Sequence, residues 1–355
     1  RINKAKELFM NLIQSNPNNI KAYYRLFRMN LKSFEKKYLD KIKLIEKEQN
    51  LNLEDKSLIN FIYSKYEKRT SVRSEIKFLN LAHEYQFNSR LKYNSRSVEY
   101  HTEILMNNFK NIKLIDKNET LLTLVKKKPI FIIGLPRSGS TLIESLITQN
   151  KREFYSYGES SIFDTSIFNQ IKKNLDKNNK IKISINKEML INSLENIYSY
   201  SKNEYFIDKS LENFFYIEII LQIFPEAKFL HTFRNKFDAA LAIYHSMLIY
   251  LPWTHSIDNI IKYISNYEII MSYFKKKYPE KILDVSLEKF TSKPNEQLKN
   301  IFDFCNMDWD EDILKSFNNK NLASKTSSFL QVRDKINKYE TNKYKPYYYL
   351  IENKF

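Results

Sequence analysis

The chain has 355 residues, of which 43% are hydrophobic, so it can bury sizeable cores and is not an intrinsically disordered protein. Its single cysteine, Cys305, excludes an internal disulfide and a cysteine-cluster metal site. Lysine and arginine outnumber the acidic residues by 58 to 41, and the net charge of +17 favours anionic partners. The alternative is that lysine only solvates the surface, since it is spread among Asn, Ile and Tyr throughout the chain.

Neither a membrane span nor a metal site is indicated by the sequence. No apolar run approaches the ~18 residues of a membrane span, and the five histidines lack a metal-binding spacing such as HExxH. We see no signal peptide in the chain, which begins at Arg1. We therefore expect a cytoplasmic protein that needs no metal, spans no membrane and does not bind nucleic acid.

The first part of the chain, residues 1–120, is predicted to be helical. Apolar residues at Leu8, Phe9, Leu12 and Ile13 form a helical stripe, and a second helix starts near Ile20 after the break "NPNN". Helix, Asn-Pro turn and helix resemble a tetratricopeptide repeat, so we predict a degenerate region of this kind. The alternative is a plain helical bundle that recruits no partner.

The second part, residues 125–355, is predicted to be an α/β domain. A strand at Ile130–Ile133 leads through a turn at Gly134–Gly139 into a helix that starts near Ser140. Three further strands, each followed by a helix, are predicted within "EYFIDKS", "AKFLHTF" and "KILDVSLEKF". This alternation predicts a P-loop-like parallel sheet flanked by helices. Ligands of such sheets bind beyond the carboxyl ends of the strands, where Lys209 and Arg234 fall.

The segment "GLPRSGST" is the strongest candidate for a functional site. It follows a strand and opens a helix, so its backbone N–H groups can cradle an anion. It matches the ATPase loop G-x-x-x-x-G-K-[ST] except that Ser140 replaces the lysine, and Arg137 offers positive charge instead. Nucleotide triphosphate chemistry, with Asp208 holding Mg²⁺, remains the weaker alternative. The chain has only three glycines, and all lie in or just after this segment: Gly134, Gly139 and Gly158.

Three segments resemble the sulfotransferase family. "PIFIIGLPRSGSTLIESLI" resembles its 5′-phosphosulfate loop, usually PRSGTTL, and "FLHTFRNKFD" is similar to its strand-end arginine element, R-[NDH]-P-x-D. "TSSFLQV", followed by Lys343-Tyr344, resembles a late segment of the form T-x-S-x-x-Q-V and Lys-Trp. Together with Gly158-Glu159 and "FIDKS", they point to the tyrosylprotein sulfotransferase-like branch, in its bacterial type with N-terminal tetratricopeptide-like helices.

The resemblance implies a sulfuryl transfer from 3′-phosphoadenosine 5′-phosphosulfate (PAPS) to an acceptor hydroxyl, without a metal. The residues implied to hold the 5′-phosphosulfate are Arg137, Ser138, Gly139, Ser140 and Thr141. Arg234 would hold the 3′-phosphate, and Ser328 and Lys343 would close over the nucleotide. Lys209 and Arg137 would supply charge to the sulfuryl group, and Glu159 would be the catalytic base.

Some positions depart from the family pattern. The serine expected to contact the 3′-phosphate is Ala242, a nucleotide-contacting tyrosine is Leu287, and Lys236 replaces a proline. These departures leave open an alternative of another class: a tetratricopeptide-type protein-binding module whose sulfotransferase domain is decayed and inactive. For an active enzyme the acceptor also stays open, and the candidates are a protein tyrosine in an acidic peptide, a carbohydrate and a lipid hydroxyl.

Overall fold

Two compact units make up the chain. The structure, a computed structural model, describes residues 2–29, 36–68, 70–115, 127–149, 155–171, 183–199, 205–308, 313–314, 336, 339–340 and 342–355. The helical unit comprises Arg1–Glu99, Ile243–Ile260 and Lys345–Lys354, and the sheet unit comprises Tyr100–Ala242, Ile261–Tyr344 and Phe355. Two later stretches of chain therefore join the N-terminal helices, whereas the sequence predicts a single boundary near residues 120–125.

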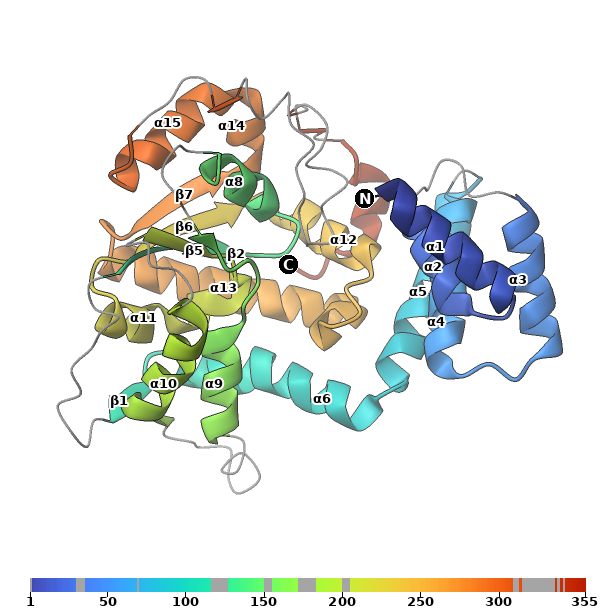
Figure 1. Cartoon of the computed structure of the whole chain (residues 1–355), viewed down its shortest axis with the longest axis horizontal. Coiled ribbons are helices and arrows are strands. Elements are labelled where there is room, and N and C mark those ends of the chain that lie inside the picture. Colours follow the sequence, from blue (N-terminus) through green and yellow to red (C-terminus); the bar gives the residue numbers. More distant parts are fainter. Residues whose placement is uncertain are drawn as a thin grey trace. The chain divides into compact units, whose positions relative to one another are not determined.

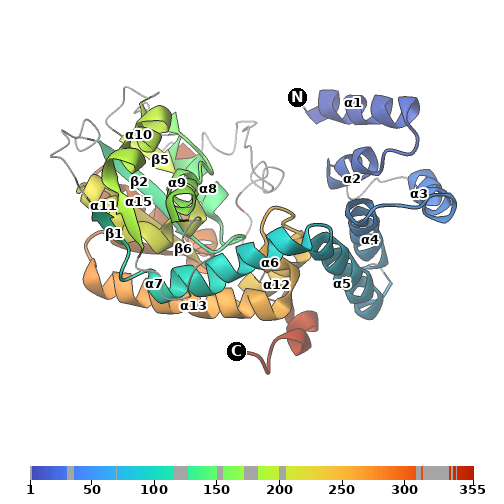
Figure 2. The same ribbon diagram turned by 90° about the horizontal axis from the view of Figure 1, so that it is seen from below.

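Helices joined by short turns make up the described part of residues 2–110 (Figures 1 and 2), which confirms the prediction of a helical N-terminal region. The helical unit contains α1 (Ile2–Ser15), α2 (Ile20–Met29), α3 (Lys36–Glu48), α4 (Leu53–Glu67), α5 (Val72–Asn88), α6 (Leu91–Glu99) and the 3₁₀ helices Pro252–His255 and Lys345–Leu350. That these helices are tetratricopeptide-like repeats stays a prediction.

Side-chain caps fix where several of these helices begin. Asn52 accepts a hydrogen bond from the backbone N–H of Asp55 at the start of α4. Ser71 does the same for the backbone N–H groups of Arg73 and Ser74 at the start of α5. Such caps satisfy N–H groups that have no partner within the helix, and each stabilises the fold by about 1 kcal/mol.

Ionisable side chains are buried where α4 and α5 contact the later segments of the helical unit. Glu75 on α5 accepts a hydrogen bond of 2.5 Å from the Tyr347 hydroxyl, and its carboxylate lies 3.2 Å from His245 Nδ1. His83 and His255 face each other with 2.9 Å between their Nδ1 atoms. Burial lowers the pKa of His245 and of His255 to about 4, so both rings are neutral at pH 7.

The sheet unit is built on five parallel strands in the order β3-β5-β2-β6-β7, which confirms the predicted α/β fold. Its strands are β1 (Lys113–Ile115), β2 (Lys128–Gly134), β3 (Tyr155–Ser156), β4 (Ser184–Asn186), β5 (Tyr205–Asp208), β6 (Lys228–Phe233) and β7 (Ile282–Ser286). Its helices are α7 (Leu105–Asn108), α8 (Ser140–Ile147), α9 (Ile162–Ile171), α10 (Lys187–Tyr198), α11 (Ile217–Ile223), α12 (Lys236–Ser246), α13 (Ile257–Lys277), α14 (Leu287–Ser292) and α15 (Pro294–Phe304). The end of α12, from Ile243, and the start of α13, to Ile260, belong to the helical unit.

The local structure differs from the prediction in two places. Strands β1 and β4 form a separate two-stranded parallel sheet, and neither they nor the two-residue β3 follow from the apolar runs of the sequence. The predicted strand "KILDVSLEKF" ends at Ser286, because Ser286 caps α14 by accepting a hydrogen bond from the Lys289 backbone N–H. The apolar residues of "LEKF" belong to that helix and not to a longer strand.

Alternate residues of β2 face two different layers of helices (Figure 1). Ile130 and Ile132 belong to a core formed with α8, α14 and α15 on one face of the sheet. Phe131 points to the other face, where its ring contacts Phe163 of α9 and Phe229 of β6. With both faces covered, the open edge left for a ligand is the one at the carboxyl ends of the strands.

α13 is the longest helix in the described part of the chain, with 21 residues. It buries Ile264, Ile270 and Phe274 and ends in three lysines, which complement the negative end of the helix dipole. The segment that contains α7 runs beside it (Figure 2). Asn266 donates to the Thr102 carbonyl, and the Phe274 ring contacts the Phe109 ring. No helix among the described residues is long and apolar enough to cross a membrane.

Lowering the pH should destabilise the helical unit. Because the folded pKa of His245 and His255 lies near 4 and the unfolded value near 6.5, the unfolded chain binds protons first. Burial also lowers the pKa of His83. Stability should be full above about pH 6.5 and fall by roughly 4 kcal/mol per pH unit towards pH 4, since each of the three histidines contributes about 1.4 kcal/mol per unit. Urea unfolding at pH 7.5, 6.0 and 5.0 measures this slope. His255→Gln should reduce the slope by about a third, and equal stability at pH 7.5 and 5.0 would contradict the assignment.

Candidate active site

The loop between β2 and α8 has three residues with positive φ, a conformation that glycine adopts easily and arginine rarely. Gly134 has φ 140°, Gly139 has φ 91° and Arg137 has φ 68°. A Cβ at Gly134 would lie 2.1 Å from the Thr232 carbonyl oxygen on β6, so this position admits no side chain. Gly139 is the N-cap of α8, and the loop thereby places the amino end of that helix at the carboxyl edge of the sheet.

The hydroxyl of Ser138 holds the loop together. It donates to the Leu135 carbonyl at 2.5 Å and lies 3.0 Å from the Thr232 hydroxyl. Ser138, Ser140 and Thr141 are all buried. A ligand in the loop would therefore meet the backbone N–H of Ser138, because the hydroxyl of that residue already has partners within the protein.

Lys209 and Glu159, the two residues predicted to act on the sulfuryl group and the acceptor, lie in direct contact. The Lys209 ammonium donates to Glu159 Oε1 at 2.6 Å. Lys209 has no exposed side-chain surface, whereas 54% of the Glu159 side chain is exposed. Gly158, with φ 63°, makes the turn before Glu159, and its carbonyl accepts a 2.8 Å hydrogen bond from the Lys209 backbone N–H. The carboxylate is thus open on one side and fixed on the other.

Asp208 is the aspartate that would hold Mg²⁺ if the chain were an ATPase. Its carboxylate is instead occupied by hydrogen bonds within the protein. It is fully buried and accepts hydrogen bonds from the Ser160 hydroxyl at 2.5 Å, the Tyr198 hydroxyl at 2.7 Å and the Ser210 backbone N–H at 2.8 Å. Within the described ranges, no group of three or more His, Cys, Asp or Glu residues could hold a metal ion. Asp208 therefore organises the segment that carries Lys209.

The Arg234 side chain, which follows β6, is held by contacts with other residues of the sheet unit. Its guanidinium donates to the Arg137 carbonyl at 3.1 Å and to the Tyr339 hydroxyl, and lies 3.6 Å from the Asp238 carboxylate. Tyr339 also donates to Asp238 and stacks its ring under the guanidinium. Arg234 Nε is buried without a hydrogen-bond partner in the described structure, so its N–H remains available to an anion.

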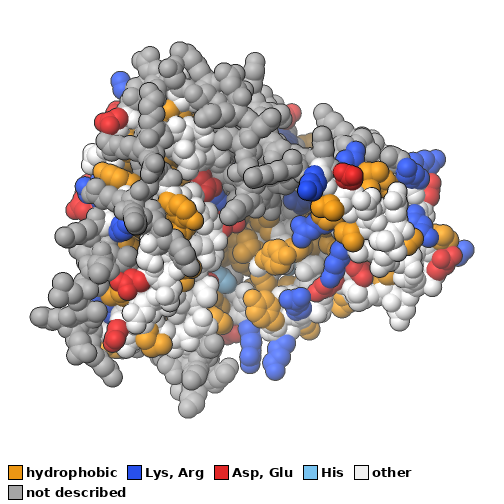
Figure 3. Space-filling model, viewed as in Figure 1, with side chains coloured by type: hydrophobic (Ala, Val, Ile, Leu, Met, Phe, Trp, Pro, Cys, Tyr) orange, Lys and Arg blue, Asp and Glu red, His pale blue; other side chains and the backbone are white. Residues whose placement is uncertain are grey.

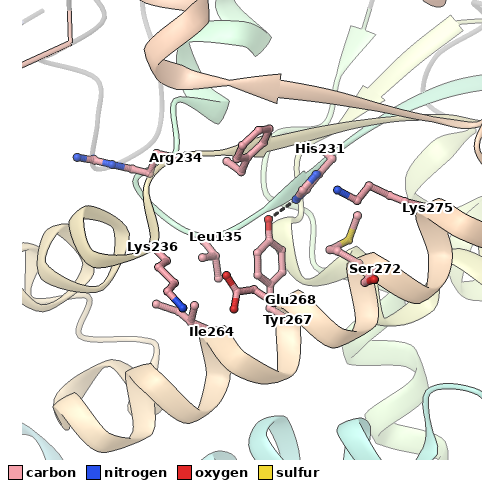
Figure 4. A pocket seen from close by; sticks show the side chains of 11 residues that line it. Leu135, His231, Arg234, Lys236, Ile264, Tyr267, Glu268, Ser272 and Lys275 are labelled. Carbon is pink, nitrogen blue, oxygen red and sulfur yellow. Dashed lines mark hydrogen bonds between the residues drawn. The ribbon is translucent and has the colours of Figure 1, made fainter. Parts of the chain in front are cut away.

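A cavity of about 330 Å³ lies beside Arg234, between β6 and α13 (Figure 4). At its base the Tyr267 hydroxyl bonds to His231 Nε2, and His231 Nδ1 donates to Asp284 at 2.6 Å. Burial lowers the pKa of His231, although the Asp284 carboxylate opposes this effect. With both ring nitrogens satisfied, His231 is a structural histidine of the sheet, as its mid-strand position predicts.

The other predicted site residues are placed as follows. Ser328 and the segment "TSSFLQV" lie outside the described residues, and the Lys343 ammonium lies 5.6 Å from the centre of the Tyr344 ring. Ala242 is buried in α12. Leu287 packs against the loop, with its Cδ1 2.7 Å from the point where a Cβ of Gly139 would stand.

Two contact residues were not predicted from the sequence. Glu144 on α8 lies 3.7 Å from the Lys209 ammonium, and Tyr339 bridges Arg234 and Asp238. An acidic residue one turn into the loop helix, facing the same edge as the loop, is a signal that could have selected Glu144. Nothing in the sequence around Tyr339 distinguishes it from the other 24 tyrosines of the chain.

Residues 129–311, just over half of the chain, match the sulfotransferase family, and the chain belongs to this family. An uncharacterised protein of Aquifex aeolicus is 29% identical in an alignment of 237 residues that covers 62% of this chain and 31% of that protein. The chain therefore spans about a third of the length of this relative.

Solved sulfotransferase structures also resemble the chain. The sulfotransferase domain of the Synechococcus PCC 7002 olefin synthase covers 64% of this chain and 90% of its own, with 18% identity and a TM-score of 0.42. The sulfotransferase domain of the curacin biosynthetic pathway covers 62% and 90%, with 16% identity and a TM-score of 0.40. Sulfotransferase STF9 from Mycobacterium avium covers 88% and 95%, with 13% identity and a TM-score of 0.36.

Substitution of the two turn glycines should separate steric conflict from backbone strain. Gly134→Ala places a methyl group 2.1 Å from the Thr232 carbonyl and should cost several kcal/mol, since β2 and β6 must move apart. Gly158→Ala meets nothing within 4 Å and costs only the left-handed conformation, about 1 kcal/mol. Chemical unfolding of both variants measures the difference, and equal losses would contradict the close approach at Gly134.

Proposed function

We propose that the chain transfers a sulfuryl group from PAPS to an acceptor hydroxyl. Membership of the sulfotransferase family supports the reaction class. The donor and the site residues are inferences from the sequence resemblance together with the chemistry of the edge where β2, β5 and β6 end. The donor supplies an activated sulfuryl group, and the protein supplies positive charge, position and a base.

The contact between Lys209 and Glu159 is the observation that carries this proposal. Sulfuryl transfer needs a cation at the transferring group, where negative charge is spread over the oxygens, and a base for the acceptor hydroxyl. The buried Lys209 ammonium and the half-exposed Glu159 carboxylate are joined at 2.6 Å just beyond the phosphate loop. In the proposed reaction Lys209 acts on the sulfuryl oxygens, and Glu159, which solvent reaches, takes the proton of the acceptor.

Donor binding is assigned to the loop and to the arginines that flank it. The backbone N–H groups of residues 137–141 and the Arg137 side chain are proposed to bind the 5′-phosphosulfate. Arg234 has an unpaired buried Nε, which suits the 3′-phosphate. A phosphate there would compete with Tyr339 for the guanidinium, so we expect Tyr339 to move when the donor binds. Ser328 and Lys343 are proposed to contact the nucleotide as well.

The acceptor we favour is a tyrosine in an acidic peptide, as the tyrosylprotein-like branch implies. The helical unit has a groove of about 310 Å³ whose lining includes Lys21, Arg25, Arg90 and the exposed ring of Tyr250. Glu54 pairs with two of these cations, which leaves the groove with net positive charge. Basic and apolar side chains are interspersed over the helical unit in Figure 3. These features suit an acidic peptide.

A protein-binding module with an inactive sulfotransferase domain is the second candidate. Two observations favour it: Ala242 stands at the position of the family's phosphate-binding serine, and Arg234 already has a carboxylate partner in Asp238. The two candidates differ in one property, because only the enzyme must bind the donor. Calorimetric titration with 3′-phosphoadenosine 5′-phosphate separates them.

Donor binding should depend on both arginines and on no metal. Arg137→Ala should weaken binding of 3′-phosphoadenosine 5′-phosphate by ~2–5 kcal/mol, the range for a desolvated charge contact. Arg234→Lys keeps a positive charge beside Asp238 but cannot form the bidentate hydrogen bonds of a guanidinium to a phosphate, so it should weaken binding as well. Lys228→Ala, at the opposite end of β6, is the matched control and should bind normally. Loss of binding in EDTA, or wild-type affinity in Arg137→Ala, would refute this assignment.

Glu159→Gln should separate donor binding from turnover. The amide keeps the shape of the side chain but cannot accept the proton, so turnover should fall at least ~100-fold while donor affinity stays nearly unchanged. Release of 3′-phosphoadenosine 5′-phosphate in the presence of an acidic tyrosine peptide measures turnover. Glu296→Gln, an exposed glutamate paired with Lys293, is the control. Near-normal turnover in Glu159→Gln would rule out this residue as the base.

A further inference from the structure

We infer that Glu144 is a positioning residue that keeps the Lys209 ammonium charged and in place during the reaction. The inference rests on the proposed roles of Lys209 and Glu159 and adds a residue that the sequence resemblance does not assign. It starts from a simple property of the site: one buried ammonium is shared by two carboxylates from different elements.

The geometry of the shared contact is asymmetric. Lys209 Nζ lies 2.6 Å from Glu159 Oε1 and 3.7 Å from Glu144 Oε2. Glu144 comes from α8, the helix that the phosphate loop opens, and only 14% of its side chain is exposed, against 54% for Glu159. Among the described residues, no third carboxylate lies within 4.0 Å of this ammonium. Glu159 is therefore the closer, solvent-reached partner and Glu144 the enclosed one.

The charges explain why a second carboxylate is needed. When Glu159 takes the proton of the acceptor it becomes neutral, and the sulfuryl oxygens and Glu144 are then the anionic partners left to Lys209. A buried ammonium without a counterion is costly, because the interior solvates it poorly. Glu144 keeps its negative charge through this step, so Lys209 stays an ammonium ion while it stabilises the sulfuryl group.

A hydrogen bond fixes the Glu144 carboxylate for this task. Ser156 on β3 donates to Glu144 Oε1 at 2.5 Å, and the same hydroxyl accepts a 3.1 Å bond from the backbone N–H of Gly158. Gly158 forms the turn that presents Glu159. One carboxylate oxygen of Glu144 thus holds, through Ser156, the turn that carries Glu159. The other carboxylate oxygen faces the Lys209 ammonium.

The kinetic test is Glu144→Gln, which keeps the shape and can still accept the bond from Ser156. We expect kcat to fall about 10-fold, equivalent to about 1.4 kcal/mol of transition-state stabilisation, with donor affinity within about twofold of wild type. Glu218→Gln is the control, since Glu218 is a half-buried glutamate paired with Lys277, which has no predicted role in the site. An unchanged kcat in Glu144→Gln, while Glu159→Gln is inactive, overturns the inference and leaves the proposed function intact.

A second test needs no activity. Glu144→Gln and Glu159→Gln each leave Lys209 with one carboxylate, but the double variant leaves it with none. The loss of unfolding free energy in the double variant should therefore exceed the sum of the single losses. The excess should disappear when Lys209→Met is added, and a double variant that does not fold should regain its fold. Additive losses, or no recovery with Lys209→Met, overturn the inference whatever the reaction proves to be.

Discussion

A fully buried ammonium group must be paired, and this requirement determines the arrangement of the carboxyl edge of the sheet. Lys209 follows β5, and its two carboxylate partners come from α8 and from the turn after β3. Pairing across three elements fixes their relative positions more tightly than apolar packing, which has no direction. The same pairing leaves the Glu159 carboxylate open to solvent on the side where an acceptor would approach.

The phosphate loop is held to β6 on one side and to Lys209 on the other. Gly134 allows β6 to approach so closely that the Thr232 carbonyl lies where a side chain would begin, and Arg234 binds the Arg137 carbonyl from the end of the same strand. Glu144 links the helix after the loop to Lys209. A ligand that binds the loop would thus contact a structure that is already organised, so little ordering free energy would be lost on binding.

The sequence predicted those features that depend on local pattern. Short apolar stretches located β2, β5 and β6, and scarce glycines located the loop. The two-residue β3 escaped prediction because it exists only through the pairing of Tyr155 and Ser156 with Phe206 and Ile207 of β5. Tyr339 escaped for a similar reason, because its partners Arg234 and Asp238 lie far away in the sequence. Glu144 also pairs with a distant residue, Lys209, and its position one turn into the loop helix was the local signal for it.

The most direct measurement follows labelled sulfur from PAPS to a hydroxyl acceptor, with the wild-type chain and with Lys209→Met. We expect label in the acceptor with wild type and at least ~100-fold less with Lys209→Met, since the transferring group loses its cation. Donor binding should persist in the variant, because the loop and Arg234 remain. Equal labelling by both proteins would contradict the account, as would a wild-type chain that binds the donor and transfers nothing to tyrosine, carbohydrate or lipid acceptors.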